Sequence, residues 1–93
     1  MAQYSKNIIS RDEKYEFCFT EIFEAGLVRV FITVTDADGR LICFSMKRNE
    51  HKHWKIVEAR SLPVWIIALE NELSHCIDGN HPTEYQAKKS LYS

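Results

Sequence analysis

The spacing of apolar residues changes at Pro63, and this change limits the fold more than any other feature of the sequence. Before Pro63, apolar residues recur mostly at every second position, as in Val28 and Val30, which is the period of a strand with one buried face. After it, they recur at intervals of three and four, as in Ile66 and Leu69, which is the period of a helix. A run of strands is therefore expected to lead into one C-terminal helix.

This order predicts an α+β fold, an antiparallel β-meander of about four strands followed by one C-terminal amphipathic helix packed on one sheet face. Residues 27–35 and 40–47 form a predicted hairpin, because Asp36-Ala37-Asp38-Gly39 supplies a tight turn between them. Residues 13–23 fit both a strand and a helix, and their aromatic content favours the strand. A shorter strand is expected around Trp54.

The predicted helix starts near Pro63, which suits a first helical turn, and ends at Asp78-Gly79-Asn80. Its buried stripe is expected to consist of Leu62, Ile66, Leu69, Leu73 and Cys76 or Ile77, with Glu70, Asn71, Glu72 and Ser74 facing water. We divide the chain into a flexible or edge segment (1–12), a single α+β domain (13–80) and a polar C-terminal tail (81–93).

The bulk composition narrows the class of function. The chain has 93 residues and a net charge of −1, whereas a domain that binds nucleic acid mainly through phosphates is usually clearly basic. Three scattered cysteines make a poor disulfide framework, and no stretch approaches the ~20 apolar residues of a membrane helix. The N-terminal residues show no secretory signal, so we expect a cytoplasmic protein that does not bind a membrane.

A sheet covered by one helix leaves a second face, and the predicted second face is more apolar than a solvated one. We therefore expect a small non-enzymatic binding protein that forms a homodimer, packed sheet to sheet or edge to edge, with another protein as a further partner. The residues assigned to this interface are Arg29, Phe31, Leu41 and Cys43. In the alternative, the N-terminal segment covers this face in a monomer.

The segment 47–55, KRNEHKHWK, is the main charge cluster and carries one tryptophan. Cations beside an aromatic ring can bind single-stranded nucleic acid through phosphate contacts and base stacking. The residues of this alternative function are Lys47, Arg48, Lys52, Trp54 and Lys55. In the opposing interpretation the segment is a solvated loop and Trp54 points into the core.

The order of a sheet followed by a helix is similar to that of the Whirly and Pur-alpha families, which bind single-stranded nucleic acid. The resemblance is one of element order and not of motif, and fold analogy alone does not establish a function. What it implies is the same nucleic-acid alternative that the segment 47–55 suggests.

No constellation in the sequence requires catalysis, a metal or a cofactor. His51, His53, His75 and His81 match no standard zinc spacing, and three glycines cannot build a phosphate-binding loop. Cys76 cannot pair with His75, because adjacent helical residues point apart. We therefore expect no catalytic residues, no metal site and no cofactor.

Overall fold

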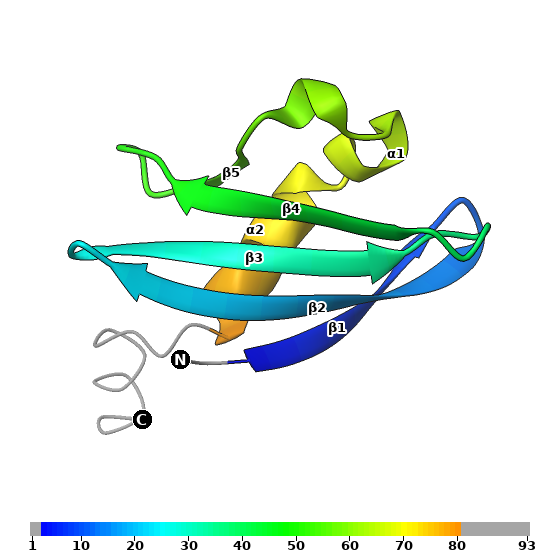
Figure 1. The fold of residues 1–93 in the computed structure, drawn as a ribbon, viewed down its shortest axis with the longest axis horizontal. Helices are drawn as coiled ribbons and strands as arrows, with labels where there is room; N and C mark the ends of the chain where they lie inside the picture. Colours follow the sequence, from blue (N-terminus) through cyan, green and yellow to red (C-terminus); the bar gives the residue numbers. More distant parts are fainter. Residues whose placement is uncertain (1–2, 81–93) are drawn as a thin grey trace.

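The computed structural model describes residues 3–80, which form one antiparallel sheet followed by short helices (Figure 1). The strands are β1 (Gln3–Ser10), β2 (Glu13–Glu24), β3 (Leu27–Thr35), β4 (Leu41–Arg48) and β5 (Trp54–Ile56). After them come the 3₁₀-helix η1 (Ala59–Ser61) and the α-helices α1 (Val64–Ile67) and α2 (Glu70–Asn80). The strands lie in the sheet in their sequence order, so the sheet is a five-stranded meander.

The predicted α+β fold is confirmed: a β-meander leads into a C-terminal helix that packs on the sheet. Residues 13–23 are strand, as their aromatic content indicated. The sheet has one strand more than the approximate count, because β1 pairs with β2 along its whole length and forms an edge of the sheet. An edge position was one of two alternatives for residues 1–12, and the tail assigned to residues 81–93 lies outside the described residues.

The β1–β2 hairpin closes through a two-residue turn that its residue types do not predict. Arg11 and Asp12 both have positive φ, at 51° and 64°. Two-residue hairpin turns favour this backbone, but Asn and Gly usually occupy it, and arginine is an unusual choice. The Arg11 guanidinium lies 5.1 Å from the ring centre of Trp65, a cation–π contact that connects this turn to α1.

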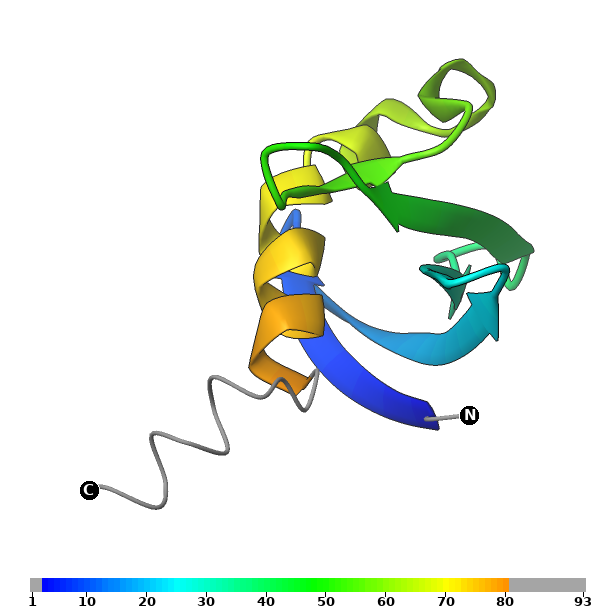
Figure 2. The same ribbon diagram turned by 90° about the vertical axis from the view of Figure 1, so that its left-hand side faces the viewer.

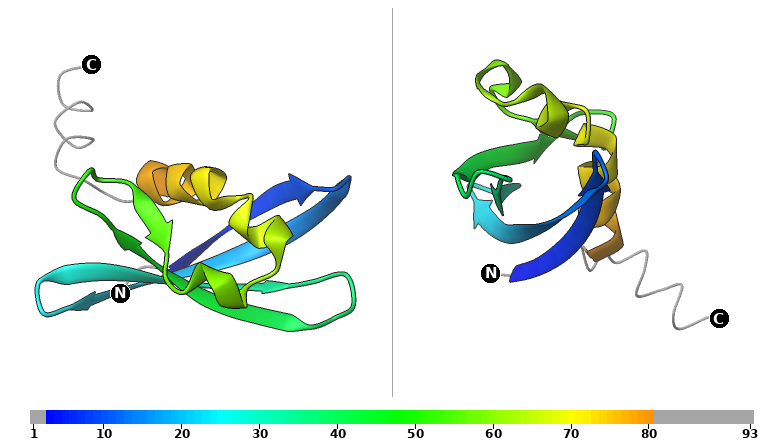
Figure 3. Two further views of the ribbon diagram at one scale, coloured as in Figure 1. Left: turned by 90° about the horizontal axis from the view of Figure 1, so that it is seen from above. Right: turned by 90° about the vertical axis from the view of Figure 1, so that its right-hand side faces the viewer.

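The sheet curves around α2, which lies against its concave face (Figures 2 and 3). Each strand sends alternate side chains to this face, as the period of two predicted. The buried side chains there are apolar and come from every strand and both α-helices: Ile8, Tyr15, Phe17, Phe19, Val30, Ile32, Val34, Phe44, Met46, Trp54, Ile56, Ile66, Leu69, Leu73 and Ile77.

The predicted single helix is divided in two. Pro63 precedes α1, as expected from its missing N–H, but α1 ends at Ile67 and α2 begins at Glu70. At the junction the Leu69 amide bonds to the Ile66 carbonyl, a tighter contact than the α-helical one. The buried stripe nevertheless includes Ile66 and Leu69, as predicted.

One prediction for this helix is wrong, because Glu70 and Ser74 do not simply face water. Ser74 Oγ accepts a hydrogen bond from the Trp54 amide, and Glu70 Oε2 accepts one from the Ile56 amide. Asp78 Oδ1 accepts from the Trp54 indole N–H. These three side chains recur every four residues on α2. Glu70 and Ser74 satisfy backbone amides on the outer edge of β5 that no further strand pairs, and Asp78 holds the Trp54 side chain.

Candidate functional site

The four residues predicted for an interface lie on the convex face of the sheet, opposite α2. Arg29 and Phe31 alternate with the buried residues of β3, and Leu41 and Cys43 do the same on β4. Phe31 is 40% exposed and Leu41 is 64% exposed, and Cys43 is also exposed. The fold therefore brings the four residues to one surface.

The centre of the convex face carries no charge. The strand registers place Ser5, Cys18, Thr33 and Cys43 side by side in one cross-strand row. The next row consists of Gln3, Thr20, Phe31 and Ser45. We call these eight residues the neutral rows. Within residues 3–80 no helix or further strand covers them, because β1 lies at the sheet edge and both α-helices lie on the other side (Figure 2).

The three cysteines are free thiols in different surroundings. Cys18 and Cys43 are exposed on the convex face and are separated by the strand that carries Thr33. Two strand spacings amount to about 9.5 Å, beyond the reach of an intramolecular disulfide. Cys76 lies on α2, where burial raises the pKa of its thiol, with a further rise from Glu72 and an opposing effect from Lys6.

The five residues of the nucleic-acid alternative do not share a surface. Trp54 is buried at 1% exposure and points into the core, as the opposing interpretation held, so its ring has no free face for a base. Arg48 lies on the same side of the sheet, with its guanidinium carbon 5.8 Å from the Trp54 ring centre. Lys47, its neighbour in the strand, points to the convex face, and Lys52 lies in the β4–β5 turn.

Among the described side chains, Lys55 is the member of this set that forms an ion pair: its Nζ lies 3.4 Å from Glu70 Oε1. Asn49 shapes the turn before it, since Asn49 Oδ1 accepts hydrogen bonds from the His51 and His53 amides. The segment is therefore an ordered turn with its cations spread over two faces of the sheet, rather than a single basic surface.

The pairing of β3, β4 and β5 brings together a different group of cations, which the sequence analysis did not predict. Arg29 is directly opposite Lys47, and Lys47 is directly opposite Lys55. We call these three residues the cation row. Its signal was present in the sequence: the turn pairs Asp36 with Arg40, and counting back along both strands from this pair places Arg29 opposite Lys47.

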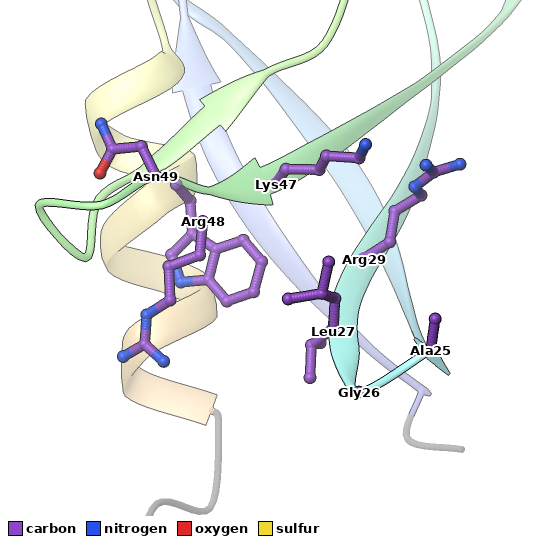
Figure 4. Close-up of a pocket in the computed structure, with 9 residues that line it drawn as sticks. Ala25, Gly26, Leu27, Arg29, Lys47, Arg48 and Asn49 are labelled. Atoms are coloured by element: carbon purple, nitrogen blue, oxygen red, sulfur yellow. The ribbon is translucent and has the colours of Figure 1, made fainter.

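A cavity of about 480 Å³ opens beside the cation row, at the end of the sheet where β2 turns into β3. Residues 25–29 and 47–49 line it together with Trp54. The charged ends of Arg29 and Lys47 point toward one another, and Leu27 lies between them and Arg48 in the close-up (Figure 4). The cavity thus combines cations with an apolar wall.

The described residues give little support for a metal site or a membrane-spanning helix. No three His, Cys, Asp or Glu side chains within residues 3–80 lie close enough to hold a metal ion. The acidic turn at Asp36 has a structural role, because Asp36 Oδ1 accepts hydrogen bonds from the Asp38 and Arg40 amides. No helix among these residues has both the length and the apolar character to cross a membrane.

Comparison of the chain with protein-family models, with curated proteins and with solved structures gives no match. The convex face and the cavity beside the cation row are therefore the two features from which a function can be argued.

Proposed function

We propose that this protein is a small non-enzymatic binding module that self-associates through the convex face of its sheet. The observation that carries the proposal is the combination of the neutral rows, which contain the exposed Phe31, with further exposed apolar side chains beside them, Leu27 and Leu41. Exposed apolar surface without charge at its centre is typical of interfaces, whose cores are depleted in charged residues.

The charges around the neutral rows favour one arrangement of two copies. A two-fold axis along the strands would set the cation row of one copy against that of the other, and like charges repel. An axis across the strands instead sets the cation row opposite the end of the face that carries Glu16, which is exposed. We therefore propose that the strands of the two copies run in opposite directions across the interface.

The curvature of the sheet limits the strength of such a dimer. Three strands of about seven residues cover on the order of 350 Å² of flat sheet at ordinary strand spacings, so contact on β2, β3 and β4 is at the low end of interface sizes. We expect a weak and reversible dimer with a dissociation constant in the micromolar range or above. Weak self-association leaves the same surface available to another protein partner.

A cytoplasmic location is part of the proposal. Its support is the placement of the cysteines, since Cys18 and Cys43 are exposed on the proposed contact surface and too far apart to protect each other in an intramolecular disulfide. Exposed thiols persist in a reducing compartment and become oxidised outside it.

The test is sedimentation equilibrium of the wild-type protein and of Phe31→Asp over a wide concentration range. The aspartate places a charge at the centre of the contact, where it would lose its water without gaining a partner, so dimerisation should weaken at least about 30-fold. Ala37→Asp is the matched control, because it adds the same charge in the exposed β3–β4 turn, away from the neutral rows.

The proposal expects a concentration-dependent dimer for the wild type and for Ala37→Asp, and a folded monomer for Phe31→Asp. A wild-type protein that remains monomeric at millimolar concentration overturns the proposal. A dimer that persists unchanged in Phe31→Asp places the contact elsewhere, for example at the β1 edge.

Single-stranded nucleic-acid binding remains the second candidate, and the cation row favours it. Since Trp54 is buried, this candidate now depends on phosphate contacts from exposed cations such as Lys47 in the cation row and Lys52 in the β4–β5 turn, without base stacking. It predicts an affinity for an oligonucleotide that falls steeply with salt. The double variant Lys47→Glu and Lys52→Glu should abolish such binding, and binding unchanged by this variant contradicts the candidate.

A further inference from the structure

The two edges of the sheet differ in how their backbone groups are satisfied. At the β5 edge, Glu70 and Ser74 accept hydrogen bonds from the Ile56 and Trp54 amides. At the other edge, β1 pairs with β2 alone, and among the described residues no hydrogen bond reaches its outer side. The outer edge of β1 is therefore an open row of donors and acceptors.

The strand register shows which residues carry these open groups. Ser10 and Glu13 flank the two-residue turn, so each donates a backbone hydrogen bond to the other. Bonded and non-bonded pairs then alternate along an antiparallel ladder, so the even-numbered residues of β1 bond to β2. The odd-numbered residues turn their N–H and C=O groups outward, and all four are exposed: Gln3, Ser5, Asn7 and Ile9.

β1 lacks most of the features that keep edge strands from pairing. Such strands are usually short, bulged, interrupted by proline or covered by another element. β1 has eight residues, contains no proline, and pairs with β2 residue for residue without a bulge. Its one charged residue is Lys6, which is exposed. The edge is therefore long and regular enough to accept a further strand.

Lys6 indicates which strand fits this edge. A second copy related by a two-fold axis would run antiparallel to β1, and one register pairs all four outward residues: Gln3 with Ile9 and Ser5 with Asn7. That register sets Lys6 against Lys6 of the second copy in a non-bonded pair, where side chains are closest and like charges repel. A segment of another protein with an acidic residue at this position gains an opposite-charge pair instead.

Lys6 is available for such a pair. Its side chain points to the concave side of β1, where its charge opposes the increase that burial causes in the pKa of the Cys76 thiol. The ion pairs among the described side chains are His51–Glu50 and Lys55–Glu70, so none of them involves Lys6. A carboxylate on an added strand can therefore pair with Lys6 without replacing either of these ion pairs.

We propose that the outer edge of β1 binds an extended segment of another protein that carries an acidic residue opposite Lys6. The outward N–H and C=O groups of the four odd-numbered residues bond the backbone of the segment, and Lys6 selects its central side chain. This proposal does not rest on self-association, because it uses backbone groups at the sheet edge rather than side chains of β3 and β4.

Titration of the whole chain with synthetic peptides, followed by NMR of its backbone amides, tests the proposal. The probe is a blocked seven-residue peptide of valine and threonine with glutamate at its centre, and the reference peptide has lysine there. The glutamate peptide should bind at least about threefold more tightly, because it pairs with Lys6, and Lys6→Glu should reverse the preference. Absence of binding by both peptides, or a preference that Lys6→Glu leaves unchanged, overturns the proposal.

A pair of variants tests the backbone contact. Asn7→Pro removes an outward N–H and fills its space with the proline ring, while the bonds to β2 remain, so peptide binding should weaken at least about tenfold. Asn7→Ala is the matched control, since it changes the same side chain but keeps the N–H, and its affinity should stay within about twofold of the wild type. Equal binding by the two variants contradicts strand addition.

Methylated peptides give a second measurement that leaves the protein unchanged. N-methylation of the two residues beside the central glutamate removes donors that face β1, so this peptide should bind at least about tenfold more weakly. N-methylation of the glutamate itself removes an N–H that points away from β1 and should cost much less. Equal losses for the two methylated peptides overturn the proposal.

Two variants separate this proposal from self-association through the convex face. Phe31→Asp should bind the glutamate peptide like the wild type, because Phe31 lies on β3, away from the β1 edge. Asn7→Pro should dimerise like the wild type in sedimentation equilibrium. Loss of the dimer in Asn7→Pro would assign the β1 edge to a second copy and overturn its assignment to another protein.

Discussion

The two faces of the sheet are built from the same strands yet differ in almost every property. On the concave face, side chains such as Phe17 and Ile32 are fully buried against α2. On the convex face, Phe31, which precedes Ile32 in β3, and Leu41 of β4 remain exposed. One helix covers one face, and within residues 3–80 nothing equivalent covers the other.

The comparison separates the residues that folding explains from those that it does not explain. The concave face combines apolar burial with the bonds from Glu70, Ser74 and Asp78 to β5, so its residues are explained by folding alone. The convex face carries an uncharged centre and, at one end, the directly opposed cations Arg29 and Lys47, and the packing of the core explains neither feature.

The largest effect on the free energy of unfolding is expected from truncation of a side chain on the concave face. Phe17→Ala should reduce the free energy of unfolding by about 3–5 kcal/mol, because Phe17 is fully buried and its removal leaves a cavity in the core. Urea denaturation followed by circular dichroism measures the change. A loss below about 1 kcal/mol would mean that the concave face is not the core.

A smaller effect is expected where α2 caps the sheet edge. Glu70→Ala leaves the Ile56 amide without its acceptor and should cost about 1–3 kcal/mol. Glu72→Ala is the control, since it removes an exposed acid from the same helical turn. Equal losses of stability in the two variants would show that the Glu70–Ile56 bond contributes nothing specific.

The concave side should also make stability depend on alkaline pH. Burial raises the pKa of the Tyr4 phenol, with further increases from the Glu21, Cys76 and Asp78 charges, and burial raises the pKa of the Cys76 thiol. The unfolded chain therefore releases these protons at lower pH than the folded one, near the ordinary values of 9.0 for Cys and 10.0 for Tyr.

The contribution of Tyr4 and Cys76 to the free energy of unfolding should accordingly be constant below about pH 8. It should decline as the pH rises above about 9. Tyr4→Phe should flatten the part of the decline above about pH 10. Denaturant titrations at a series of pH values measure this, and the same slope in Tyr4→Phe would exclude Tyr4 as a cause.

The smallest effect belongs to the convex face. In dilute monomer, Phe31→Ala should change the free energy of unfolding by less than about 1 kcal/mol, because its side chain is already in contact with water. The same denaturation assay as for Phe17→Ala gives the comparison directly. A loss as large as that of Phe17→Ala would show that the two faces contribute alike to folding.

Much of this contrast could be predicted from local pattern. The period of two in Val28, Val30 and Ile32 identified one face of β3, and the turn at Asp36 identified the hairpin, from which its register could have been worked out. The cation row follows from that register and was missed because Lys47 was grouped with its neighbours in sequence rather than with Arg29 across the sheet.

Other features depend on tertiary contacts that no local pattern contains. Trp54 is held in place by Ser74, which bonds its backbone amide, and by Asp78, which bonds its indole N–H; these residues are 20 and 24 positions away and on another element. The β1–β2 turn uses positive φ at Arg11 and Asp12, where the residue types give no hairpin signal. The cavity forms only where the end of β4 lies beside the β2–β3 turn.

The most direct test of the central claim is the rate of alkylation of Cys43 as a function of protein concentration, read by mass spectrometry. Cys43 is exposed in the neutral rows, and Cys76 on α2 is an internal standard. Self-association through the convex face predicts that Cys43 labelling slows relative to Cys76 as concentration rises. A constant ratio across concentrations at which sedimentation shows a dimer would contradict it.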